Sequence, residues 1–374
     1  MKDSRRKFLK TSAVIAAGAS FPQQSPAFHI GKPIKDDLLQ DAGMHLCLAY
    51  FWGIEPRKVA LARQMRVLGA VGGINASLAG LPHDRNYELQ AVKATKEAWA
   101  KEGLDLKVIE GPPSLYTKTK LGLAGRDEEI EHFVTFMRSI AAVGIDTVCY
   151  NWMPVISWAR TQMDRASRGG ALVSAFDINA IQDQEPITEY GPLTHEMMWN
   201  NLAYFLKAVI PEAEKLGVKL ALHPDDPPID GIRGIPRIMT SVKAFKKLVD
   251  LVPSSSNGLT FCQGSFASMG GNGQGEDIPA AIRYFGKREL IHFVHFRDVR
   301  GYKEHFEETF HDDGKTDMYE SMKAYYEVGF RGPLRPDHVP TMYGDSNEHP
   351  GYSTIGTLFA IGYIRGLMEG VVKA

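Results

Sequence analysis

Four side chains that commonly bind transition metals follow four short apolar segments in the second half of the chain. They are His223 in VKLALHPDD, Cys262 in NGLTFCQGS, His295 in LIHFVHFRD and Asp337 in GPLRPDH. If these segments are neighbouring strands of one barrel, the four side chains meet at the rim where the strands end. Taken singly, each has a plainer explanation, since such histidines are usually hydrogen-bonded and cysteines usually lie in the core. Together they predict a metal site, and the mixed nitrogen, sulfur and oxygen donors suit Zn(II), Fe(II), Mn(II) or Co(II).

Further polar side chains follow the same predicted strand ends. Arg297 lies two residues after the second histidine and on the same strand face, where its planar guanidinium could hold a substrate carboxylate. His338 directly follows the aspartate, and Tyr352 begins the last predicted helix, so both are candidates for acid–base work beside a metal. For Tyr352, packing at the helix start is an equally good explanation. His311, in TFHDDGKTD, is a second candidate for substrate binding from a loop.

The segments that must position these residues alternate between strand-like and helix-like patterns. Glycines follow several helical segments, at the positions where helices end. The alternation predicts an α/β fold, a single (β/α)8 TIM barrel with long βα loops over the C-terminal rim. A doubly wound open sheet is the alternative, but no GxGxxG follows the first strand, which weakens its dinucleotide-binding form. The predicted strands are 44–51, 70–74, 104–110, 146–151, 218–223, 258–262, 290–296 and 332–337.

Two insertions interrupt the regular spacing, at 154–194 and at 259–277, where the second contains MGGNGQGE. Each follows the end of a predicted strand, so we expect both to lie over the same rim as lids or substrate walls. The segment HPDDPP carries Asp225 and Asp226, which are most simply interpreted as an exposed turn stiffened by prolines.

Composition excludes several classes of protein. The 374 residues carry a net charge of −1 without a basic stripe, so no nucleic-acid partner is expected. No apolar run reaches the roughly 18 residues of a membrane span. Three cysteines without paired spacing do not form a disulfide framework. The sequence does not determine the oligomeric state, and a homo-oligomer is possible.

The N-terminus has the pattern of an export signal. SRRKFLK precedes the mildly apolar stretch TSAVIAAGAS, an order typical of a twin-arginine (Tat) signal. A solvated basic segment before a first helix is the alternative. We therefore expect a signal and linker at 1–32, a TIM-barrel catalytic domain at 33–374, and a periplasmic or otherwise exported protein.

From about residue 51 to its C-terminus, the chain resembles the mannonate dehydratase family. The resemblance rests on long segments, among them KVIEGPPS, KLGLAGRDEEIE, VCYNWMPVISWARTQ, LALHPDDPP, FVHFRDV, FHDDGKTDM, RPDH and NEHPGYSTIG. It implies a barrel similar to xylose isomerase and the removal of water from D-mannonate to give 2-keto-3-deoxy-D-gluconate, with Mn(II) or Fe(II). It also implies metal ligands at His223, Cys262, His295 and Asp337 and acid–base residues at His338 and Tyr352.

The chain departs from the family pattern at substrate-facing positions. Val339 stands where the family usually has glycine after PDH, and Gly111 and Pro112 replace part of VIESVPV. AYFWG replaces the first-strand FRWYG, so an arginine is missing. A related sugar acid is therefore also a plausible substrate.

The sequence thus predicts a metal-dependent dehydratase acting on a small sugar acid. A metal-dependent isomerase or epimerase on the same scaffold is the alternative, since it would move protons between carbons without losing water. An exported carbohydrate-binding protein without catalysis is the third interpretation.

Overall fold

The computed structural model describes residues 42–270 and 275–374. All of them belong to one compact unit, Gln40–Ala374. The predicted Tat signal and the predicted boundary after residue 32 lie outside the described residues.

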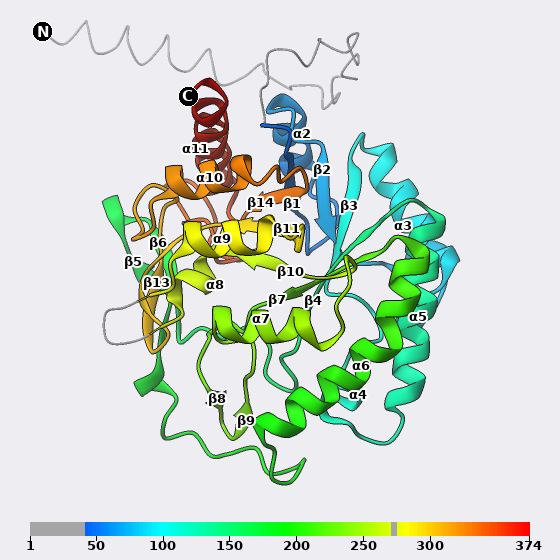
Figure 1. Ribbon diagram of the computed structural model, residues 1–374. Helices are drawn as coiled ribbons and strands as arrows, with labels where there is room; N and C mark the ends of the chain where they lie inside the picture. The colour runs from blue at the N-terminus through cyan, green and yellow to red at the C-terminus, as the bar shows by residue number, and fades with distance from the viewer. Residues whose placement is uncertain (1–41, 271–274) are drawn as a thin grey trace, which may run out of the picture. The chain divides into compact units, whose positions relative to one another are not determined.

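Eight parallel strands close into a barrel, with the helices outside it (Figure 1). This arrangement confirms the predicted TIM barrel, and every predicted strand is present with ends shifted by only a few residues. In order around the barrel the strands are β1 (His45–Ala49), β14 (Pro333–Pro336), β11 (Ile291–Phe296), β10 (Asn257–Cys262), β7 (Lys219–His223), β4 (Thr147–Asn151), β3 (Asp105–Glu110) and β2 (Gly69–Gly72).

The strands are apolar because both of their faces are covered. Inward-facing side chains form a small cluster inside the barrel, and outward-facing ones join a larger core beneath the helices. This double burial explains why the strands appear in the sequence as nearly continuous apolar runs. The inner cluster consists of Cys47, Val71, Val108, Cys149, Ala221 and Phe293.

Four of the outer helices begin where a side chain accepts a hydrogen bond from the first turn. Thr194, Ser241, Asp277 and Asp317 each accept from the backbone amide three residues later. The long helices are α2 (Pro56–Gln64), α3 (Leu89–Lys101), α5 (Arg126–Ala142), α6 (His195–Leu216), α7 (Val242–Leu251), α9 (Ile278–Gly286), α10 (Met318–Glu327) and α11 (Thr354–Lys373); α4 (Thr117–Leu121) and α8 (Gln263–Ser268) are short.

Two loops far apart in sequence build a second, antiparallel sheet, which we term the loop sheet. The insertion after β4 supplies β5 (Gln162–Ala166) and β6 (Leu172–Asp177), and the segment after β11 supplies β12 (Val299–Tyr302) and β13 (His305–Glu308). Their order is β12-β13-β6-β5, so the two loops are joined where β13 pairs with β6. A small hairpin of β8 (Gly231–Ile232) and β9 (Ile235–Pro236) follows β7.

In the described part of the chain, α11 alone has the length and composition of a membrane span, with a mean hydropathy of 1.4 over its most apolar window. One such helix is weak evidence for a span. Its buried residues include Ile361, Ile364 and Met368, which belong to the core of the barrel. The absence of a membrane span therefore stays a prediction.

Candidate active site

The carboxyl ends of the barrel strands surround a cavity of about 360 Å³, which we term the rim cavity. Because parallel strands end at the same rim, residues distant in sequence converge there. Its lining includes Glu110 from β3, Asn151 from β4, His223 from β7, His295 from β11, Asp337 after β14, and His338 and Tyr352 beyond it.

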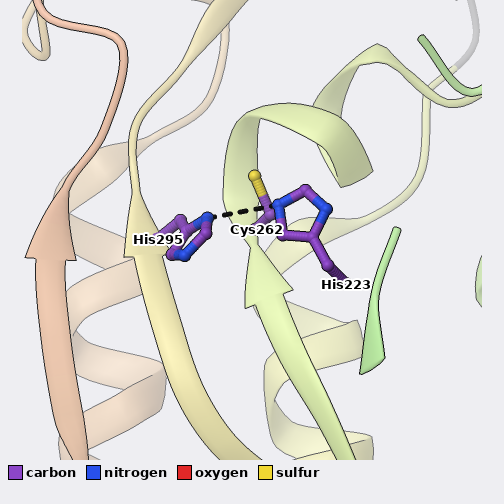
Figure 2. Close-up of side chains that lie close together, drawn as sticks. All are labelled: His223, Cys262 and His295. Atoms are coloured by element: carbon purple, nitrogen blue, oxygen red, sulfur yellow. Dashed lines mark hydrogen bonds between the residues drawn. The ribbon is translucent and has the colours of Figure 1, made fainter. Parts of the chain in front are cut away.

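Three of the four predicted metal ligands lie together at this rim. One nitrogen of His223, one of His295 and the sulfur of Cys262 are all within 4.8 Å of one another. Figure 2 shows the two imidazoles facing each other beside the thiol, with His223 Nε2 3.2 Å from His295 Nδ1. His223 Nδ1 lies 2.7 Å from the carbonyl oxygen of Pro224 and so carries the proton, which leaves Nε2 with a lone pair.

Asp337, the fourth predicted ligand, lies beside this group. Its Oδ2 is 3.6 Å from His295 Nδ1 and 3.9 Å from Cys262 Sγ. Arg335 Nη1 approaches its other oxygen at 2.6 Å, and Arg297 Nε lies 3.0 Å from Oδ2. Burial alone would raise the pKa of Asp337, but Arg335 and other cations outweigh burial and hold the pKa well below its usual range. The carboxylate is therefore ionised, as a metal ligand must be.

The donor spacing fits one transition metal. A four-coordinate site with bonds of about 2.0–2.3 Å separates its donors by about 3.3–3.8 Å, and the three distances given above, 3.2, 3.6 and 3.9 Å, are close to this range. Among the arginines and carboxylates nearest these donors, three arginines face four carboxylates, and this excess of negative charge favours a bound cation. These neighbours are Arg160, Arg297 and Arg335, with Glu110, Asp226, Glu308 and Asp337.

Glu110 supports the ligands from the end of β3. Its Oε1 accepts from Arg335 Nη2 at 2.8 Å and lies 3.4 Å from His295 Nε2, which is suited to fixing the orientation of that ring. Burial would raise the pKa of Glu110, but Arg335 and His295 lower it to about 2. Glu110 is not among the site residues predicted from the sequence, although its position at a strand end in KVIEGPPS marks it as a candidate.

The two predicted acid–base residues lie on the side of Asp337 that faces the cavity. His338 has a backbone φ of +44° and donates from Nδ1 to Glu308 Oε1 at 2.9 Å. The Tyr352 hydroxyl donates to Asp337 Oδ1 at 3.2 Å, and its ring meets the His338 ring edge-on at 5.7 Å. Burial, with the negative charge of Asp337, raises the pKa of Tyr352 well above its usual value. The structure thus brings both residues to the predicted metal ligands.

Arg297 belongs to a buried group of four charged side chains, which we term the charge cluster. Its members are Arg160, Asp226, Arg297 and Glu308. Arg297 Nη1 donates to both oxygens of Glu308 at 2.6 Å, and Nη2 donates to Asp226 at 2.6 Å. Its side chain is almost fully buried and does not line the rim cavity. That it binds substrate stays a prediction, because its donors are engaged within the protein.

The two aspartates of HPDDPP do not lie in an exposed turn. Asp225 and Asp226 are buried, so the interpretation of HPDDPP as an exposed turn is wrong. Asp226 compensates Arg160 and Arg297, whereas Asp225 accepts from the backbone amide of Met239. Arg160 and Arg297 come from other loops, and Met239 lies further along the connection that follows β7, so these partners could not be read from the segment itself.

His311 is fully buried and does not line the rim cavity. Burial lowers its pKa to about 4. Its predicted contact with substrate stays a prediction.

Aromatic side chains form the mouth of the rim cavity. Trp52 is half exposed and stacks on His349, with ring centroids 3.8 Å apart. Phe51 meets Tyr352 edge-on at 5.3 Å, and Trp158 meets His338 at 5.2 Å. The first-strand segment AYFWG therefore contributes apolar surface to the mouth of the cavity.

Comparisons with known proteins agree on one family. A family model described as D-mannonate dehydratase (UxuA) matches residues 44–189 and 184–374. The mannonate dehydratase of Streptococcus agalactiae is 35% identical over 326 residues, which cover 80% of this chain and 92% of that protein. The one from Thermotoga petrophila is 34% identical over 360 residues, covering 87% and 98%.

Solved structures give the same result. The crystal structure of mannonate dehydratase from Streptococcus suis serotype 2 matches with a TM-score of 0.80 and 33% identity, over 88% of this chain and 94% of that one. A structure of L-ribulose 3-epimerase matches with a TM-score of 0.53 at 14% identity, which is a likeness of fold alone.

Proposed function

Because this chain belongs to the mannonate dehydratase family, we propose that it removes water from D-mannonate and releases 2-keto-3-deoxy-D-gluconate. The chain is a hydro-lyase on a TIM barrel. One observation carries the specific proposal: residues expected to bind metal and to move protons, spread over positions 223–352, come together at one rim of the barrel.

We assign a divalent metal to His223, Cys262, His295 and Asp337, with Mn(II) or Fe(II) as the expected ion. The mixed donor set suits either ion, because imidazole and carboxylate accept both and the thiolate favours iron. When bound, the ion supplies Lewis-acid chemistry that acidifies the hydrogen on C2, next to the substrate carboxylate.

His338 is the proposed base. Since Nδ1 donates to Glu308, the neutral ring keeps its lone pair on Nε2, which can accept a proton from C2. Glu308 also stabilises the imidazolium that forms when the proton arrives. Tyr352 is the proposed acid, because its hydroxyl carries a proton and already donates to Asp337.

The proton balance of the reaction follows from these roles. The C2–H bond breaks as its proton passes to His338, a double bond forms between C2 and C3, and the C3–O bond breaks. The hydroxide leaves as water with the proton of Tyr352, and the enol rearranges to the 2-keto acid. A second proton transfer from His338 to Tyr352, directly or through solvent, restores the starting forms.

We also propose that the enzyme works after export by the Tat route. The order of charge and apolar residues in 1–32 supports this location. Fractionation of cells that express the full chain tests it, since replacing the pair Arg5 and Arg6 by lysine should keep the protein in the cytoplasm.

The reaction is tested by incubating Mn(II)- or Fe(II)-loaded protein with a panel of sugar acids, D-mannonate first. A dehydratase gives a product lighter by one water that reacts as an α-keto acid, whereas an isomerase or epimerase conserves the formula. Failure to dehydrate any acid in the panel would refute the proposal.

The two proton-transfer roles are separated in deuterium oxide. Tyr352→Phe should lose dehydration but still exchange the C2 hydrogen of mannonate, whereas His338→Asn should lose both reactions. Tyr343→Phe, at a fully exposed tyrosine, is the control and should behave as the wild type. Exchange that persists in His338→Asn would refute the assignment of the base.

A further inference from the structure

Asn151 ends β4 and lines the rim cavity beside the predicted metal ligands. In the barrel it lies between Glu110 on β3 and His223 on β7, and it is in register with His223. A polar side chain at this place can contact substrate oxygens next to the metal site. Neither the sequence patterns nor the proposed chemistry gives it a role.

The orientation of the Asn151 amide follows from its neighbours. Its Oδ1 accepts from Lys120 Nζ at 2.9 Å and from the backbone amide of Met153 at 3.1 Å. Both neighbours are donors at neutral pH, so a reversed amide would set its NH2 group against two donors. Within the described residues, Nδ2 has no hydrogen-bond partner in the protein, and its two N–H groups are available to a ligand.

Lys120 is itself held in place by the fold. It lies in α4, is buried, and its backbone carbonyl accepts from Asn201 Nδ2 of α6 at 3.2 Å. Burial lowers its pKa to about 8, which still leaves the ammonium charged near neutral pH. Lysines are rarely buried, because removing the ammonium from water is costly. The one side-chain hydrogen bond that Lys120 makes among the described residues goes to the Asn151 amide that lines the cavity, so its burial is best explained by a role in orienting that amide.

We propose that Asn151 is a specificity residue that donates to a hydroxyl or carboxylate oxygen of the sugar acid, and that Lys120 is the positioning residue that fixes its amide. This inference rests on the proposed function for the class of substrate. Lys120 acts only through Asn151 and does not touch the substrate.

A double-mutant cycle tests this coupling. Lys120→Met and Asn151→Leu should each lower kcat/KM for D-mannonate by about 10-fold or more, mainly through KM, as expected for the loss of a buried hydrogen bond to substrate. Because Lys120 acts through the amide, adding Lys120→Met to Asn151→Leu should cause almost no further loss. If the losses instead multiply, Lys120 acts independently and the inference is overturned.

A control separates this effect from general damage to α4. Lys118→Met alters an exposed lysine two residues away in the same helix and should leave kcat/KM unchanged. Metal content of Lys120→Met should equal that of the wild type. A lower metal content would mean that the variant perturbs the ligands, and that result would overturn the positioning role.

A binding measurement keeps the inference testable if the proposed function fails. Wild-type turnover of the sugar-acid panel tests that function alone. In parallel, the rise in Tm caused by each sugar acid reports binding without turnover. Any acid that stabilises the wild type should stabilise Lys120→Met and Asn151→Leu much less. Equal stabilisation, or no stabilisation of the wild type by any acid, would overturn the inference.

Discussion

Replacing Glu308 by glutamine should destabilise the metal-loaded protein by about 3–5 kcal/mol, the usual effect of leaving a buried charge unpaired. In the charge cluster, the two arginines are balanced by Glu308 and Asp226, and none of these side chains is more than 2% exposed. Glutamine has nearly the same shape but no charge, so one guanidinium loses its compensation. The variant also weakens the bond that holds His338 Nδ1, so kcat should fall with stability.

The pKa of Glu308 supports this magnitude. Burial would raise it, but Arg297 and other cations outweigh burial and lower the pKa from 4.5 to about 2. A carboxylate with a lowered pKa in the folded state contributes stability above pH 4.5, and this contribution is lost as the pH falls through about 2. At about 1.4 kcal/mol for each pH unit, the shift corresponds to about 3 kcal/mol.

Glu307→Gln is a matched control on the same strand. Glu307 is partly exposed and pairs with Arg165 and Arg300, which are both exposed, so its loss should cost less than about 1 kcal/mol. Urea unfolding followed by circular dichroism compares the two variants through their midpoints and slopes. Equal midpoints for Glu308→Gln and Glu307→Gln would refute the argument that the charge cluster is held by charge balance.

Three further predictions concern the metal, pH and the loop sheet. Chelation should abolish activity, and added Mn(II) or Fe(II) should restore it. By elemental analysis, the His223→Ala and Cys262→Ser variants should each bind less than one tenth of the metal that the wild type binds. If both variants bind as much metal as the wild type, His223 and Cys262 are not ligands. His292 is buried, and its pKa is lowered to about 4, mainly by burial and further by Lys219. Because the unfolded chain binds this proton more readily, the free energy of unfolding of the wild type should fall by up to about 3 kcal/mol as the pH drops from 6.5 to 4. In urea unfolding at several pH values, the His292→Leu variant should show a weaker dependence of stability on pH. Gly301→Ala should lower Tm by several degrees. Gly301 has a φ of +88°, and an added Cβ would lie 2.1 Å from the carbonyl oxygen of His305. An unchanged Tm would show that the β12–β13 hairpin relaxes without cost.

The barrel and the convergence of the predicted ligands could be foreseen because both follow from the pattern of apolar runs. Each predicted ligand follows an apolar run, and the closed parallel topology brings the ends of such runs to one rim. Several helices, though not all, begin at capping residues that are visible in the sequence, such as Thr194 and Ser241.

The charge cluster could not be predicted, because it depends on pairing between distant loops. Glu308 lies on β13, and nothing in HFEETF marks this residue rather than its neighbour Glu307 as the buried one. Its position follows from the pairing of β13 with β6. For Arg297, one partner, Asp226, comes from the loop after β7, and the other, Glu308, lies further along the segment after β11 that Arg297 itself begins.

The loop sheet also has a consequence for the order of folding. Its central pairing joins His305 to Asp177, 128 positions apart, and its two halves follow β4 and β11, which are separated in the barrel by β7 and β10. Contacts of such long range carry a large loop-closure cost until the strands between them are in place, so we expect the barrel to assemble before the sheet. In native-state hydrogen exchange, the amides of the loop sheet should therefore be among the first to open.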